Sequence, residues 1–230
     1  MRPVNRNRNR NTRTYTDYRA ARNDLSTSIG WYCSYCEMPV KNMIEIEHVI
    51  PVNRGGKEIS WRNFLLSCKY CNTVKSNHNA SRSGYLWPDT DNTFLAFHYQ
   101  YGTAITYHSK LTSNAILKNM AISTIRLFGL DREPGTNPPP TPADTRWISR
   151  NDVWNIAYES LTDLKESPSS ATLKRQIAKT AAATGHFSIW MEVFKYEPSM
   201  RQLFIENFTG THQRSFDKQG HPQPRQQGQL

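Results

Sequence analysis

Four cysteines in two closely spaced pairs are the residues of this sequence best suited to holding a metal ion. They are the only cysteines of the 230-residue chain and form the pairs CSYC and CKYC, at Cys33, Cys36, Cys68 and Cys71. A gap of two residues lets both thiolates of a pair reach one ion, and two pairs complete the tetrahedral sulfur shell typical of zinc. Because all four ligands come from the protein, we expect a structural zinc, so the chemistry has to lie elsewhere.

Two other uses of these cysteines are open. Two disulfides would suit an oxidising compartment, but the N-terminal residues MRPVNRNRNR lack the apolar core of a secretory signal. No apolar run approaches the roughly 20 residues needed to cross a bilayer, so we expect a cytoplasmic protein without membrane contact. A single redox-active pair would leave the second pair unexplained.

Three short elements are predicted around the cysteine pairs. Residues 43–50 alternate enough to form a short strand, and the Asn-Arg-Gly-Gly sequence at 53–56 is a strong turn signal. A second strand is expected around residues 63–66, and a helix begins near residues 71–72. Two strands and one helix around a zinc ion would form a small ββα unit.

The order of these motifs resembles the HNH (ββα-metal) endonuclease family. The pattern is CxYC, then EHVIP, then GG, then WxNFLLxCxxCNxxK, between residues 33 and 75. The resemblance implies that His48 is the general base that activates water for attack on a phosphodiester, and that Glu47 ligates the catalytic divalent ion. It implies that Asn63 braces the loop and orients the base. Asn72 stands where the family carries a second metal ligand, either histidine or asparagine.

Elementary chemistry agrees with these roles. Histidine has a side-chain pKa near neutrality, as a general base requires, and a cation neutralises charge on the phosphoryl group. A carboxylate such as Glu47 and an amide oxygen such as Asn72 are hard ligands that suit Mg²⁺ or Mn²⁺. Lys75, one helical turn beyond Asn72, and Arg54 in the turn are candidates for contact with nucleic-acid phosphates. A solvated surface position for Lys75 is equally open.

Plainer roles are open for several of these residues. A histidine on a strand is more often used for packing or hydrogen bonding than for catalysis, and Asn63 could be an ordinary turn residue. His78, beyond the start of the helix, could be an accessory ligand, although a role outside the site is the interpretation we favour. We expect Tyr35 and Tyr70, inside the cysteine pairs, to cover the zinc rather than to stack on bases.

Most of the formal net charge of +10 lies at the N-terminus. Residues 1–22 carry seven arginines and one aspartate, whereas the rest of the chain is close to neutral. We interpret residues 1–22 as a basic, flexible arm. Such an arm could contact a nucleic-acid backbone, stay solvated, or dock on an acidic partner.

The nuclease module is expected to span residues 23–110 and to include a hairpin after the turn-rich segment WPDTDNT. In that segment Asp89, Asp91 and Asn92 are spaced loosely like a cation-binding loop, but a closing glutamate is missing. We favour capping of turns by these side chains.

The remainder is expected to be mainly helical, which makes the fold class α+β. A connecting helix is predicted within residues 111–133 and a proline-rich linker at 134–142. Residues 143–210 are predicted to form a helical domain and residues 211–230 a disordered tail. The helices of that domain are expected at Asp144–Leu164, Ser169–Ala183 and His186–Asn207.

Longer stretches of the sequence narrow the resemblance. The opening MRPV, the block GWYCSYCEMP, the segment NFLLSCKYCNTVKSN and the segment YLWPDTDNTFLAF are similar to the PtuB family, the HNH subunits of Septu anti-phage systems, over about residues 1–100. That resemblance implies a partner, PtuA, an ABC/SMC-like ATPase that controls the nuclease. It predicts a metal-dependent endonuclease acting on DNA in a hetero-oligomer, with structural Zn²⁺ and catalytic Mg²⁺ or Mn²⁺.

Two other classes of function stay open. The first is a standalone restriction or homing-type HNH endonuclease, which would cut defined sites without an ATPase. The second is a non-catalytic zinc module that binds nucleic acid or protein.

Overall fold

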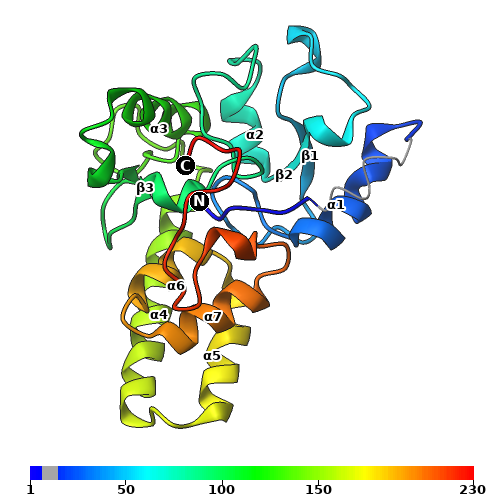
Figure 1. The fold of residues 1–230 in the computed structure, drawn as a ribbon. Coiled ribbons are helices and arrows are strands. Elements are labelled where there is room, and N and C mark those ends of the chain that lie inside the picture. Colours follow the sequence, from blue (N-terminus) through cyan, green and yellow to red (C-terminus); the bar gives the residue numbers. More distant parts are fainter. Residues whose placement is uncertain (7–14) are drawn as a thin grey trace.

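A strand pair and a helix carry the residues that the sequence singles out. The computed structural model describes residues 1–6 and 15–230. Strand β1 (Glu45–His48) pairs antiparallel with β2 (Phe64–Ser67), with His48 opposite Phe64. Helix α2 (Lys69–Lys75) follows β2 directly, and Cys68 caps it by accepting a hydrogen bond from the backbone of Cys71. The predicted ββα unit is therefore confirmed, with its helix beginning two residues earlier than expected (Figure 1).

A helical turn and a helix precede the strand pair. The 3₁₀ turn η2 (Tyr18–Ala21) continues into α1 (Arg22–Ile29), which packs against β2. Leu25 and Ile29 of α1 are buried in the core.

Residues 1–4 lie inside the protein rather than on a solvated arm. Met1 and Val4 are buried, and Val4 forms an isolated antiparallel bridge with Thr211. Arg2 is buried too, and its guanidinium donates to the carbonyl oxygens of Ile29 at 2.6 Å and Thr209 at 2.7 Å. The prediction of a flexible basic arm is therefore wrong for these residues, because guanidinium donors are satisfied here by backbone carbonyls. Arg8, Arg10 and Arg13 of the predicted arm fall in 7–14, outside the described residues.

The rest of the nuclease half consists of a short hairpin and one helix. Strands β3 (Phe97–His98) and β4 (Thr106–Tyr107) pair antiparallel, and α3 (Ala115–Phe128) packs against both β4 and α2. Asn114 caps α3 at its start and Gly129, in the left-handed region, ends it.

The C-terminal part is helical, as predicted. Helices α4 (Arg146–Glu166) and α5 (Ala171–Thr184) stand side by side in the lower half of Figure 1. They pack on α6 (Phe187–Val193) and α7 (Pro198–Asn207). The single helix predicted at His186–Asn207 is thus divided in two. Pro198 lacks a backbone donor and is favoured in the first turn of a helix, so a new helix begins there.

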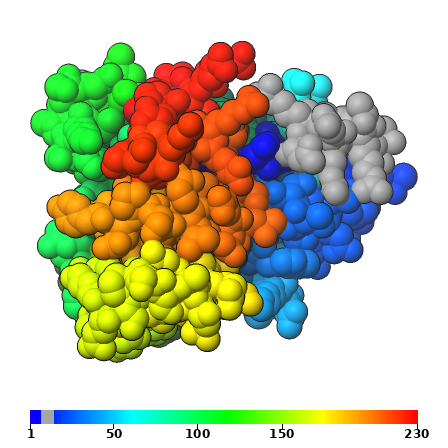
Figure 2. Space-filling model, turned by 60° about the horizontal axis from the view of Figure 1, so that its bottom comes forward, coloured from blue at the N-terminus to red at the C-terminus, as the bar shows by residue number. Residues whose placement is uncertain are grey.

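The last twenty residues are ordered, which corrects the prediction of a disordered tail. Phe216 is buried against Phe94 and Phe187. The backbone of Gln229 donates to Asp91 at 2.7 Å, and the carbonyl of Leu230 accepts from the backbone of Asn92 at 2.8 Å. In Figure 2 this segment, in red, runs along the upper edge of the molecule beside the orange part of the chain.

The turn-rich segment WPDTDNT fulfils its predicted role in part. Asp91 accepts from the backbone of Trp87 at 2.7 Å, and Asn92 caps the 3₁₀ turn η5 (Thr93–Leu95). Asp89 does something else, because it is buried and pairs with two arginines. None of the helices in the described part of the chain is long and apolar enough to cross a membrane.

Candidate active site

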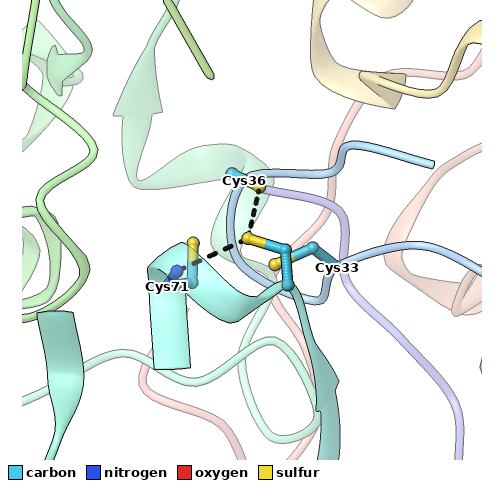
Figure 3. Close-up of side chains that lie close together, drawn as sticks. Cys33, Cys36 and Cys71 are labelled. Atoms are coloured by element: carbon cyan, nitrogen blue, oxygen red, sulfur yellow. Dashed lines mark hydrogen bonds between the residues drawn. The ribbon is translucent and has the colours of Figure 1, made fainter. Parts of the chain in front are cut away.

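The four cysteines converge on one point. Their sulfurs all lie within 4.8 Å of one another, and all four side chains are buried. Figure 3 shows Cys33, Cys36 and Cys71 turned toward one another. Sulfurs about 2.3 Å from a tetrahedral zinc are about 3.8 Å apart, and the Cys36 and Cys68 sulfurs are 3.7 Å apart. The cluster therefore fits Zn²⁺, whereas that separation is far longer than a disulfide bond.

An arginine from the helical region completes the surroundings of the cluster. Arg146, at the start of α4, donates to the sulfur of Cys71 at 3.1 Å and pairs with Asp144 at 2.7 Å. Although burial alone would lower the pKa of Arg146, the contacts with Asp144 and Cys71 raise it above its ordinary value. The guanidinium therefore stays charged and can offset the negative charge of the thiolates.

An open cavity of about 460 Å³ lies beside β1 and α2. The structure brings four sequence-predicted residues to its wall, namely Glu47, His48, Asn72 and Lys75. Tyr18 and Glu58, which sequence reasoning did not single out, also line it. The cavity is therefore the candidate active site.

His48 is held in one orientation at the end of β1. Its Nε2 lies 2.9 Å from the carbonyl oxygen of Glu58, and the rings of Tyr18 and Phe64 contact it edge-on at 4.9 and 5.3 Å. A carbonyl oxygen can only accept, so Nε2 carries the proton in this contact. In the neutral imidazole that leaves Nδ1 with the lone pair that a general base needs.

Asn63 closes the loop between the two strands. Its Oδ1 accepts from the backbone of Ile50 at 2.8 Å, and its Nδ2 donates to the carbonyls of Ile50 at 2.9 Å and Lys57 at 3.1 Å. A Cβ at Gly56 would lie 1.8 Å from the Ile50 oxygen, so only glycine allows the loop to pass this close. Asn63 thus braces the loop that carries Glu58, the partner of His48.

Glu47 and Lys75 form a buried ion pair at the base of the cavity. Both side chains are 1% exposed, and Lys75 Nζ lies 2.5 Å from Glu47 Oε1. Lys75 also donates to the backbone oxygen of His48 at 2.9 Å. The solvated position left open for Lys75 is therefore wrong, because its ammonium is buried between Glu47 and the backbone of His48, whereas its contact with a phosphate stays a prediction.

Tyr35 connects Glu47 to the zinc-binding segment. Its hydroxyl donates to Glu47 Oε2, and its ring stacks on Phe128 with centroids 3.6 Å apart. Burial raises the pKa of the Glu47 carboxyl, and Lys75 and Tyr35 oppose that rise. Tyr35 is buried, so it cannot stack on a nucleic-acid base.

Asn72 has an acidic neighbour that sequence reasoning missed. Its Nδ2 donates to Glu45 Oε2 at 2.7 Å, which leaves Oδ1 as the oxygen that can accept or ligate. The signal was present in the sequence, because Glu45 and Glu47 lie on one face of β1 while Asn72 and Lys75 lie one turn apart on α2. The two strand residues face the two helix residues, so Glu45 pairs with Asn72 and Glu47 pairs with Lys75.

Two further candidates lie outside this network. Arg54 is exposed, and its Nε donates to the carbonyl of Asn77 at 3.1 Å, so its contact with nucleic acid stays a prediction. His78 is exposed and does not line the cavity. Its Nδ1 lies 3.1 Å from the carbonyl of Val74, which gives no support to a role as an accessory ligand.

The oxygen donors of the cavity suit a hard divalent ion. Glu47 and Asn72 line it together, and they provide one carboxylate and one amide oxygen, the donor types that Mg²⁺ and Mn²⁺ prefer. Both Glu47 oxygens already have a partner, Oε1 the Lys75 ammonium and Oε2 the Tyr35 hydroxyl, so a cation at Glu47 would share the carboxylate with both.

Comparison with known proteins places a nuclease domain at the same residues as the candidate active site. The family model of the HNH endonucleases matches residues 33–78. The Septu protein PtuB of Bacillus thuringiensis is 33% identical over 63 residues, which cover 26% of this chain and 24% of that protein. The match thus spans about a quarter of the relative's length, and no solved structure matches the chain. Residues 33–78, which hold both the cysteine cluster and the cavity residues on β1 and α2, form an HNH endonuclease domain.

Proposed function

We propose that this protein is a metal-dependent endonuclease that hydrolyses phosphodiester bonds in DNA, with His48 as general base. The observation that carries the proposal is the contact between His48 Nε2 and the Glu58 carbonyl, at the edge of a cavity lined by Glu47 and Asn72. It fixes the histidine tautomer that a base requires, beside oxygen donors suited to a cation.

Each residue has a distinct task in this proposal. His48 Nδ1 accepts the proton of the attacking water, and Asn63 keeps the loop with Glu58 in place so that the imidazole does not turn. Glu47 and Asn72 would hold Mg²⁺ or Mn²⁺, which supplies charge neutralisation at the phosphoryl group. Lys75 and Tyr35 position the Glu47 carboxylate.

The similarity to PtuB supports a place for this chain in an anti-phage defence complex, with an ABC/SMC-like ATPase of the PtuA type as partner. The helical region of α4 to α7 is the proposed docking part. It carries exposed aromatic side chains, with Tyr196 83% and Tyr158 48% exposed. The zinc thiolates fit a reducing, cytoplasmic setting.

A plasmid-cleavage assay tests the proposed function. The zinc-loaded full chain, with and without the ATPase, is incubated with supercoiled plasmid and Mg²⁺ or Mn²⁺. We expect nicking or linearisation that needs the divalent ion and increases when the ATPase is present. Equal, site-specific cleavage without the ATPase would instead support a standalone enzyme. If both ions fail to support cleavage with the ATPase present, the proposed function is wrong.

A further inference from the structure

A second cavity, of about 380 Å³, has arginines as four of its eight described lining residues. Residues that are far apart in the sequence meet there, with Arg6, Arg62, Arg82 and Arg225 contributing four positive charges. Asp89 is the single carboxylate of the described lining. Four guanidiniums and one carboxylate therefore line the described part of this cavity.

The buried part of this charge is incompletely neutralised. Arg6 Nη2 lies 2.6 Å from Asp89 Oδ2, and Arg82 contacts both oxygens of the same carboxylate at 3.0 Å. Two guanidiniums thus share one buried negative charge. The arginines lower the pKa of Asp89 despite its burial, so the carboxylate is ionised. Because Arg6 and Arg82 are partly removed from water and share the single charge of Asp89, their environment favours the binding of a further anion.

The arginines are held in place rather than loosely exposed. Arg6 donates to the carbonyls of Trp61 at 2.7 Å and Phe64 at 3.1 Å, and Arg82 donates to the carbonyl of Arg62 at 2.9 Å. Arg82 also lies over the ring of Trp87. Because these arginine side chains are already held in place, they lose little further conformational entropy when they bind a multidentate anion such as phosphate.

The cavity is close to the candidate active site through β2. Arg6 contacts the carbonyl of Phe64, and Phe64 is the strand partner of His48. Paired residues in an antiparallel sheet are about 5 Å apart. An anion in this cavity therefore lies one strand away from the proposed base, within the reach of the same polymer.

We propose that this cavity binds a backbone phosphate of the nucleic-acid substrate, next to the segment that is cut. The inference rests on the proposed nuclease function for its choice of ligand. Nucleic acid is favoured over an acidic protein because Arg6 of this cavity contacts the carbonyl of Phe64, the strand partner of His48. Arg62 is its test residue because its side chain is exposed, so replacing it leaves the buried pair of Arg6 and Arg82 intact.

The experiment measures binding of a short fluorescein-labelled DNA, single-stranded and duplex, to the zinc-loaded full chain without added Mg²⁺ or Mn²⁺. Arg62→Glu should raise Kd by about tenfold or more, and Arg62→Ala should lower the slope of log K against log salt by about 1. Arg175→Glu, the same charge change at an exposed position on α5, should leave Kd within about twofold. Circular dichroism confirms that the variants are folded.

The outcomes separate this site from the proposed function. Unchanged DNA binding by Arg62→Glu, or no DNA binding by the wild type, would overturn the phosphate site whatever the cleavage assay shows. Weakened binding by Arg62→Glu in a chain that never cleaves would keep the phosphate site and reject the nuclease. Binding of a labelled ATP, measured in parallel, tests whether the ligand of the cavity is a free nucleotide rather than a nucleic acid. If Arg62→Glu weakens ATP binding and leaves DNA binding unchanged, the nucleic-acid assignment is wrong.

Discussion

Replacing Cys71 with serine, or removing zinc with a chelator, is expected to unfold the ββα unit and to lower the melting temperature of the whole chain. Without the ion the two cysteine pairs lose the ligand bonds that join them, and structural zinc contributes about 10 to 16 kcal/mol of apparent binding energy in small zinc modules. The strands β1 and β2 are only four residues each, so the ion is expected to add a large share of the stability, beside the side-chain contacts that join β1 to α2.

The effect should extend beyond residues 33–78 because Arg146 of α4 donates to the sulfur of Cys71. The measurement is thermal unfolding followed by circular dichroism, together with the zinc content of each sample. Thr73→Ser, an exposed change on the same helix, is the matched control and should melt like the wild type. A zinc-free chain that melts at the wild-type temperature would show that the cysteines do not hold a structural ion.

Replacing Lys75 with methionine is expected to destabilise the protein by about 3 to 5 kcal/mol, because it leaves the Glu47 carboxylate buried without its cation. Methionine is similar in length to the lysine stem, so the loss comes from charge rather than from packing. Chemical denaturation measures the free energy of unfolding.

The double variant Glu47→Gln with Lys75→Met should recover most of that loss, since neither charge then remains. Lys69→Met, at an exposed position on the same helix, should change the free energy of unfolding by less than about 0.5 kcal/mol. A loss in Lys69→Met as large as that in Lys75→Met would contradict the assignment of the effect to the Glu47 pair.

Local sequence patterns predict the elements of this fold well. The alternation before Pro51, the cysteine spacing and caps such as Ser170, which accepts from the backbone of Leu173, are local signals. They locate β1, β2, α3 and α5 because hydrogen bonding and periodicity within a short segment decide these elements. Pro198 was also a local signal for the start of a new helix, but the apolar residues on both sides of it favoured a single helix over His186–Asn207.

Contacts between distant segments were not predictable in the same way. By composition Arg2 and Arg6 belong to a solvated arm. In the structure Arg2 donates to the carbonyl of Ile29 at the end of α1, and Arg6 donates to carbonyls of η4 (Trp61–Asn63) and β2. The tail is ordered because Asp91 and Asn92 provide partners for its backbone. Nothing in the local sequence of either segment reveals such a partner.

The candidate site shows the same division. The cysteine cluster follows from residue type and spacing, and the loop brace at Asn63 from the resemblance to the HNH family. The burial of Lys75 and the contact of Glu45 with Asn72 depend on how α2 lies against β1. Residue type alone suggests that Lys75 contacts a phosphate, whereas the packing of α2 against β1 brings its ammonium into an ion pair with Glu47.

The initial rate of plasmid cleavage by His48→Ala tests the central claim most directly. The assay uses Mg²⁺ or Mn²⁺ and the ATPase, with the wild type and His78→Ala, an exposed histidine outside the cavity, measured alongside. Loss of a general base should slow cleavage by about 10² to 10⁴-fold, while His78→Ala should cleave at the wild-type rate. Metal-dependent cleavage by His48→Ala at the wild-type rate would contradict the assignment of His48 as the base.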